Sequence, residues 1–216
     1  MPTDLHLMTL MQWLSPGFPI SSYAYSHGLE MAIAEGHVTD AESLHDWLDG
    51  LLIHGTGRSD AIWVRVSYDA TDNDELGALN AQANAFIPAR ERRIEAQKQG
   101  AAFVRTINEV WEADLPKDLL LPLAVGAAAR RQAIAPDIVA PLYLQAFLTN
   151  LVASAQRLMP LGQTEGQHVL SRLHPQSLSV ARATQGLSVS DIHSVAFMSD
   201  IMAMRHETLQ PRLFHT

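Results

Sequence analysis

Residues 138–156 read Ile138-Val-Ala-Pro-Leu-Tyr-Leu-Gln-Ala-Phe-Leu-Thr-Asn-Leu-Val-Ala-Ser-Ala-Gln156 and contain no charged side chain. This length is close to that of a membrane-spanning helix. Polar side chains nevertheless recur along one side, at Gln145, Thr149, Asn150 and Gln156. Apolar side chains from Leu144 to Leu158 repeat at three- and four-residue steps on the other side. The pattern predicts a buried helix in a soluble bundle, with Pro141 in its first turn and Pro160 beyond its end.

The rest of the chain also shows helical periodicity, and no stretch alternates with the period of two that is typical of strands. We expect an all-α, single-domain bundle of about ten helices spanning 1–216. Asp4 is expected to cap the first helix, and Thr39 with Glu42 to form a capping box. One further helix is expected to end at about Glu35. Others are expected to cover Ser59–Asp69, Asp72–Phe86, Pro88–Trp111 and Leu119–Arg131, and Gly126 in the last of these allows close contact between helices. The final three helices are expected to begin at Thr164, at Pro175 and at Ser190 or Asp191.

Composition restricts the classes of function. The formal net charge is −8, which argues against a nucleic-acid partner because such proteins need a basic face. The absence of cysteine excludes disulfides and thiolate metal sites, and it fits a cytoplasmic protein. The first residues have neither a basic region nor a signal-cleavage pattern, so we expect neither secretion nor membrane attachment.

Histidines raise one metal hypothesis. Glu42-x-x-His45 and Glu165-x-x-His168 resemble the Glu-x-x-His pairs of carboxylate di-iron bundles, and Glu30 with Glu91 or Glu95 would add carboxylates. Glu42 and Glu165, however, fall in first helical turns, where carboxylates commonly cap the helix or interact with its dipole. A di-iron enzyme therefore remains one alternative, and a generic helical interaction domain is another. Because no nucleophile elbow or phosphate loop is present, we expect no catalytic activity and no cofactor.

Three stretches combine polar residues with apolar anchors. They are Leu14–Glu30, Arg157–Leu170 and the tail Met204-Arg-His-Glu-Thr-Leu-Gln-Pro-Arg-Leu-Phe-His-Thr216. Arginine and aromatic side chains supply much of the energy of protein interfaces. An apparently exposed Leu-Phe pair in the tail therefore indicates partner binding, and residues 1–20 and 205–216 are expected to be mobile partner-binding ends.

Together these stretches resemble the UreF family of urease accessory proteins. The resemblance runs from Leu10 to the C-terminus. It is carried by Ser15-Pro16 to Pro19 with Ser22-Tyr23-Ala24-Tyr25-Ser26 and Gly28-Leu29-Glu30, by Arg157-Leu158 with Pro160-Leu161-Gly162-Gln163 and Gln167, and by Ser199-Asp200-Ile201 with Met204-Arg205-His206-Glu207-Thr208 and Arg212-Leu213-Phe214.

The resemblance implies a dimer-forming chaperone that is not an enzyme and binds no metal. Such a protein would join UreD (also called UreH) to the GTPase UreG, promote nickel insertion into apo-urease and modulate GTP hydrolysis. The partner contacts it implies are Tyr25, Ser26, Gly28, Glu30, Arg157, Gln163, Gln167, Arg205, His206, Glu207, Arg212, Leu213 and Phe214. The tail departs from the family pattern at Gln210, Pro211 and His215, and Pro211 predicts that the chain leaves its last helix by about Leu209.

Overall fold

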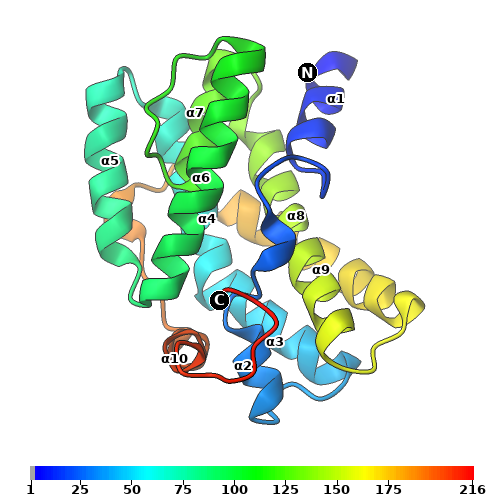
Figure 1. Ribbon diagram of the computed structural model, residues 1–216. Coiled ribbons are helices and arrows are strands. Elements are labelled where there is room, and N and C mark those ends of the chain that lie inside the picture. The colour runs from blue at the N-terminus through cyan, green and yellow to red at the C-terminus, as the bar shows by residue number, and fades with distance from the viewer. Residues whose placement is uncertain (1–2) are drawn as a thin grey trace.

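Helices account for all of the regular structure in residues 3–216, the part of the chain that the computed structural model describes (Figure 1). The all-α prediction is therefore confirmed, and the helices form a single domain. The α-helices are α1 (Asp4–Trp13), α2 (Leu29–Ala34), α3 (Ala41–His54), α4 (Thr56–Asp69), α5 (Asn73–Phe86), α6 (Arg90–Trp111), α7 (Leu121–Arg131), α8 (Pro136–Leu158), α9 (Gln163–Ala183) and α10 (Phe197–His206). Two short 3-10 helices, η1 (Ser22–Ala24) and η2 (Val189–Asp191), lie between them.

The centre of the bundle is formed by α4 and α8. Helix α4 packs on α7, α8 and α3, and α8 packs on α9 and α2. Helices α4 and α7 approach closely where Gly126 faces the backbone of α4. A Cβ atom at Gly126 would lie 2.1 Å from the carbonyl oxygen of Val64, so only glycine allows this separation of the helices. The predicted close helix contact is confirmed.

Helix α8 is long and apolar enough to span a membrane, and half of its most apolar window is buried among neighbouring helices. The sequence-based prediction of a buried helix is therefore confirmed. The proline in its first turn is Pro136, however, and Pro141 lies inside the helix. The prediction that Pro141 lies in the first turn was therefore wrong. The missing N–H of this proline removes only one backbone hydrogen bond, and buried side chains before and after Pro141 keep the helix continuous.

Two predicted caps differ from the observed ones. Thr3, not Asp4, caps α1 by accepting a hydrogen bond from the His6 N–H. The capping box of α3 is formed by Asp40 and Ser43 instead of Thr39 and Glu42. The shift by one residue leaves the Glu42 carboxylate outside the box.

The later boundaries also needed correction. Helix α4 begins at Thr56 instead of Ser59. Helix α9 begins at Gln163 after Gly162, whose N–H is bonded by Glu165, and it continues through Pro175, so two predicted helices are one. The buried face of α9 runs on both sides of Pro175, and this packing offsets the lost hydrogen bond. The last helix begins at Phe197 because the predicted start belongs to η2.

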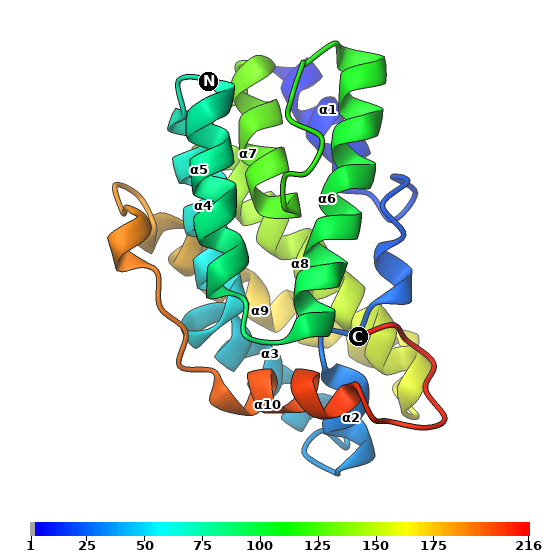
Figure 2. The same cartoon turned by 60° about the vertical axis from the view of Figure 1, so that its left-hand side comes forward.

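Helix α10 crosses one end of the bundle and contacts α2 and α6 (Figure 2). The loop before α2 approaches α10 at Gly28, which has φ +78° and precedes the helix instead of lying within it. A Cβ atom on Gly28 would lie 2.8 Å from the backbone nitrogen of Ala203. The contact brings two segments that are distant in sequence into one region.

Candidate functional site

The C-terminal tail, residues 207–216, folds back onto the segment between η1 and α2. The His215 N–H donates to the Ala24 carbonyl at 2.9 Å, and the Ser26 N–H donates to the main-chain oxygen of Thr216 at 2.9 Å. The Ser26 hydroxyl also donates to this oxygen. The C-terminus therefore lies beside the start of α2 (Figure 1). We call this arrangement the seated tail.

Glu30 is the anchor of the seated tail. Its side chain lies in the first turn of α2 and the residue is 7% exposed. Its carboxylate accepts hydrogen bonds from the backbone N–H groups of Leu213, at 2.6 Å, and Phe214, at 2.9 Å. Hydrogen bonds to a charged acceptor are stronger than those between neutral groups. This buried carboxylate thus holds the tail backbone at Leu213 and Phe214, while Ala24 and Ser26 hold its last two residues.

His206 connects the anchor to α6. Its ring is fully buried, with Nε2 3.0 Å from Glu30 and Nδ1 2.7 Å from Glu91. A carboxylate oxygen only accepts, so the ring donates to both only as the positively charged imidazolium. Arg212 from the tail, whose side chain is 41% exposed, adds a positive charge at 2.6 Å from Glu91. These contacts connect α10 and the tail to both α2 and α6.

Phe214 is the apolar anchor of the tail and is only 2% exposed, whereas Leu213 is 55% exposed. The Arg157 guanidinium lies 4.4 Å from the centre of the Phe214 ring and donates to the Tyr23 carbonyl at 2.7 Å. The apparently exposed Leu-Phe pair is therefore divided, with Phe214 facing the chain and Leu213 facing solvent. Burial raises the pKa of the nearby Tyr25 hydroxyl, with a further contribution from Glu95.

The other predicted contact residues are placed less centrally. Arg205 pairs with Glu35 at 2.8 Å across the contact between α10 and α2. Glu207, Gln163 and Gln167 are exposed, and within residues 3–216 their side chains form no hydrogen bond with the tail. The structure therefore joins Tyr25, Ser26, Gly28, Glu30, Arg157, Arg205, His206, Arg212, Leu213 and Phe214 in one region and leaves the two glutamines of α9 and Glu207 outside it.

Two groups of residues were missed as parts of this site. Glu91 and Glu95 entered the sequence analysis only as metal carboxylates, but Glu91 binds His206 and Arg212, and Glu95 accepts from the Thr216 hydroxyl at 2.7 Å. Exposed apolar side chains also follow one side of α10, and Leu213 in the tail is exposed as well. We call these residues together the α10 apolar face, and they are Phe197, Met198, Ile201, Met204 and Leu213. The spacing of four and three residues from Phe197 to Ile201 to Met204 is the signal that could have revealed it.

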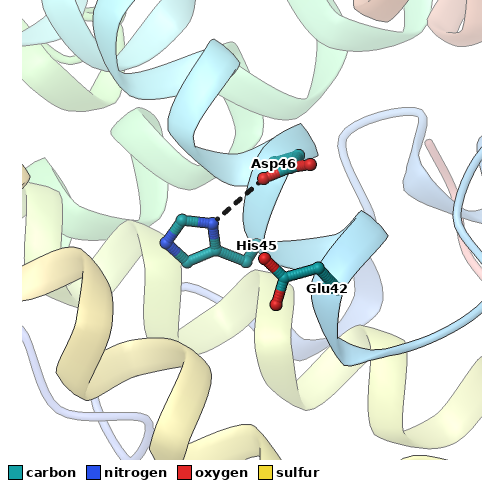
Figure 3. A group of neighbouring side chains, drawn as sticks. All are labelled: Glu42, His45 and Asp46. Atoms are coloured by element: carbon teal, nitrogen blue, oxygen red, sulfur yellow. Dashed lines mark hydrogen bonds and ion pairs between the residues drawn. The ribbon is translucent and has the colours of Figure 1, made fainter.

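The residues of the di-iron alternative do not form one cluster. Within residues 3–216, the only group of three potential ligands is Glu42, His45 and Asp46 on α3 (Figure 3). Glu42 binds Arg172 of α9 at 2.6 and 2.9 Å, and this arginine lowers the pKa of the carboxyl group. Glu165 caps α9 instead. The alternative pairing of Glu42/His45 with Glu165/His168 around two metal ions is therefore not found in the part of the chain that the structure describes.

Comparison with known proteins agrees with the sequence resemblance. Residues 38–174 match the family model UreF. A protein of Roseobacter denitrificans named urease accessory protein UreF is 45% identical over 216 residues, covering all of this chain and 96% of the relative. Proteins of the same name from Ruegeria pomeroyi and Ruegeria sp. are 40% and 46% identical, covering 100% and 97% of this chain and 99% and 97% of the relatives. The chain therefore belongs to the UreF family of urease accessory proteins.

Proposed function

We propose that this protein is a non-enzymatic adaptor in urease maturation. It joins UreD (UreH) to the GTPase UreG, and the complex promotes nickel insertion into apo-urease in the cytoplasm. The protein acts as a homodimer and modulates GTP hydrolysis by UreG. The names of its relatives, each a urease accessory protein UreF, support the general role.

The observation that carries the proposal is the position of the seated tail next to the α10 apolar face. Glu30 binds the backbone of the tail that follows α10, and Leu213 in this tail is exposed, as are several apolar side chains of α10. Exposed apolar side chains in such number are typical of protein interaction sites. We infer that UreD binds here and that the seated tail is its binding-competent conformation.

A second exposed apolar surface lies on α1, within the predicted N-terminal partner-binding region. Leu5, Met8 and Met11 are 71%, 69% and 72% exposed. Methionine adapts its shape readily and is common at binding surfaces. We propose that α1 contributes to the same complex, and that partner binding reduces the mobility of both ends of the chain, at an entropic cost that keeps the complex reversible.

The proposal is tested by capture of purified UreD with the Leu213→Asp variant. We expect the affinity for UreD to fall by about tenfold or more, because the variant places a charge in an apolar interface. Leu178→Asp is the matched control, since Leu178 is 45% exposed on α9, outside the α10 apolar face. Capture should be measured by surface plasmon resonance together with urease activity in cells. Equal capture by both variants and the unaltered chain would exclude this surface as the UreD site.

A further inference from the structure

A cavity of about 520 Å³ lies between α1, α4, α6 and α8, and apolar side chains form most of its wall. Its volume is in the range of pockets that hold small organic molecules. Polar groups gather where α4 meets α8, and include Thr56, Asp60 and Tyr143, with His27 from the loop before α2. The proposed adaptor role gives this cavity no function, and the inference below does not depend on that role.

The polar groups of the cavity are positioned by contacts among themselves. Thr56 and Asp60 are four residues apart on α4 and so lie on one side of the helix. The Tyr143 hydroxyl donates to Oδ2 of Asp60 at 2.7 Å, and Nε2 of His27 lies 3.0 Å from the Thr56 hydroxyl. The His27 ring also packs edge-on against Phe147, with 5.0 Å between ring centres. The chain thus holds a carboxylate and an imidazole in fixed positions beside an aromatic wall.

One acceptor position remains available to a ligand. Among residues 3–216, Oδ1 of Asp60 takes part in no hydrogen bond, whereas Oδ2 accepts from Tyr143. Nδ1 of His27 also has no partner, but this atom is enclosed by protein atoms. Polar atoms away from solvent are normally satisfied, so the unpaired carboxylate oxygen that lines the cavity points to a bound molecule.

The charge of the cavity indicates which molecule. Burial raises the pKa of Asp60 to about 6, with a further increase from Glu95, while the Tyr143 hydrogen bond and Arg92 oppose it. Asp60 is therefore largely ionised at neutral pH. Burial lowers the pKa of His27 well below its usual value, so its ring is neutral.

The remaining charged groups that line the cavity do not reverse its sign. Arg92 forms an ion pair with Glu95, and both side chains are largely buried. Asp200 of α10 also lines the cavity, and burial raises its pKa as well. Arg157 at the edge of the cavity is engaged by Tyr23 and Phe214. The polar centre around Asp60 thus carries a net negative charge that no neighbouring cation is left to balance.

We propose that this cavity binds a small organic cation, a primary ammonium group on an apolar body, with the ammonium N–H groups donating to Asp60. The apolar wall buries the body of the ligand. The carboxylate and the aromatic rings both favour a positive charge. A divalent metal ion fits less well, because the cavity does not bring three carboxylate or imidazole ligand atoms within 4.8 Å of one another in the described residues.

The test is calorimetric titration of the full chain with 2-phenylethylammonium, compared with neutral 2-phenylethanol and anionic phenylacetate. We expect the ammonium compound to bind about tenfold more tightly than the alcohol, because a charge-assisted hydrogen bond is lost in the alcohol. Affinity should fall as the pH is lowered from 7.5 to 5, because Asp60 becomes protonated below about 6 while the ammonium keeps its proton. Equal affinities for the ammonium compound and the alcohol, or no binding at millimolar concentration, would overturn the proposal.

Variants locate the site. Asp60→Asn preserves the shape of the side chain and is expected to lower the affinity for 2-phenylethylammonium by about tenfold. Asp74→Asn removes the same charge at an exposed position on α5, outside the cavity lining, and is expected to have no effect. An unchanged affinity in folded Asp60→Asn would contradict the proposal. If that variant does not fold, the comparison of ligands and the pH profile of the unaltered chain decide the matter.

Discussion

Glu30→Ala is expected to release the C-terminal tail and to abolish high-affinity capture of UreD. The substitution removes the acceptor of the Leu213 and Phe214 N–H groups and leaves His206 beside one carboxylate instead of two. Breaking a buried ion pair by removing one partner typically costs about 3–5 kcal/mol. If the tail must be seated to bind, a cost of about 3 kcal/mol lowers the apparent affinity roughly 100-fold. Calorimetry with purified UreD and urease activity in cells measure the effect.

The matched control for this substitution is Glu35→Ala. Glu35 forms a similar ion pair across the contact between α2 and α10, with Arg205 at 2.8 Å, but accepts no hydrogen bond from the tail backbone. Partly exposed pairs of this type contribute about 1 kcal/mol or less, so UreD capture should change little. Equal losses in the two variants would show that the whole contact between the helices matters, and that Glu30 has no special role as the anchor.

Gly126→Ala is expected to cause a large loss of stability. The new methyl group would lie 2.1 Å from the Val64 carbonyl and 2.2 Å from the Ser67 hydroxyl, so α4 and α7 must move apart. Overpacking of a tight core costs about 1–3 kcal/mol or more, and a backbone neighbour yields less readily than a side chain. The free energy of unfolding in urea should fall by about 3 kcal/mol.

Gly77→Ala on α5 provides the comparison for Gly126→Ala. A Cβ atom at this position has no neighbour within 4 Å, and the residue lies inside a helix. Replacement by alanine should therefore increase the free energy of unfolding by about 0.5–1 kcal/mol. No loss of stability in Gly126→Ala would contradict the packing of α4 on α7, and a loss in Gly77→Ala would contradict the open position of Gly77 on α5.

The helical architecture could be predicted from local patterns because each helix has an apolar stripe that must be buried. The uncharged stretch 138–156 with its apolar stripe predicted α8. The helix expected over Asp72–Phe86 is α5, which Asp72 caps. Predictions failed where tertiary packing overrode a local signal. Pro141 and Pro175 would end isolated helices, but each lies inside a helix whose buried face continues on both sides.

The candidate site could be predicted only in part. Glu30, His206 and Arg212 were recognised as members of motifs, and the structure brings them together. Glu91, the shared partner of His206 and Arg212, is more than a hundred residues from both, and no local pattern records such a pairing. The burial of Phe214 and the exposure of Leu213 likewise depend on how the tail turns back, which Glu30 determines from a distant helix.

The central claim is that the seated tail is the conformation that UreD recognises. Hydrogen exchange of the Leu213 and Phe214 amides, measured in the free chain and in the complex with UreD, tests it most directly. Both amides donate to Glu30, so we expect their exchange to slow on UreD binding in the unaltered chain and to remain fast in Glu30→Ala at the same UreD concentration. Faster exchange of these amides in the complex would show that the partner displaces the tail, and would contradict the account.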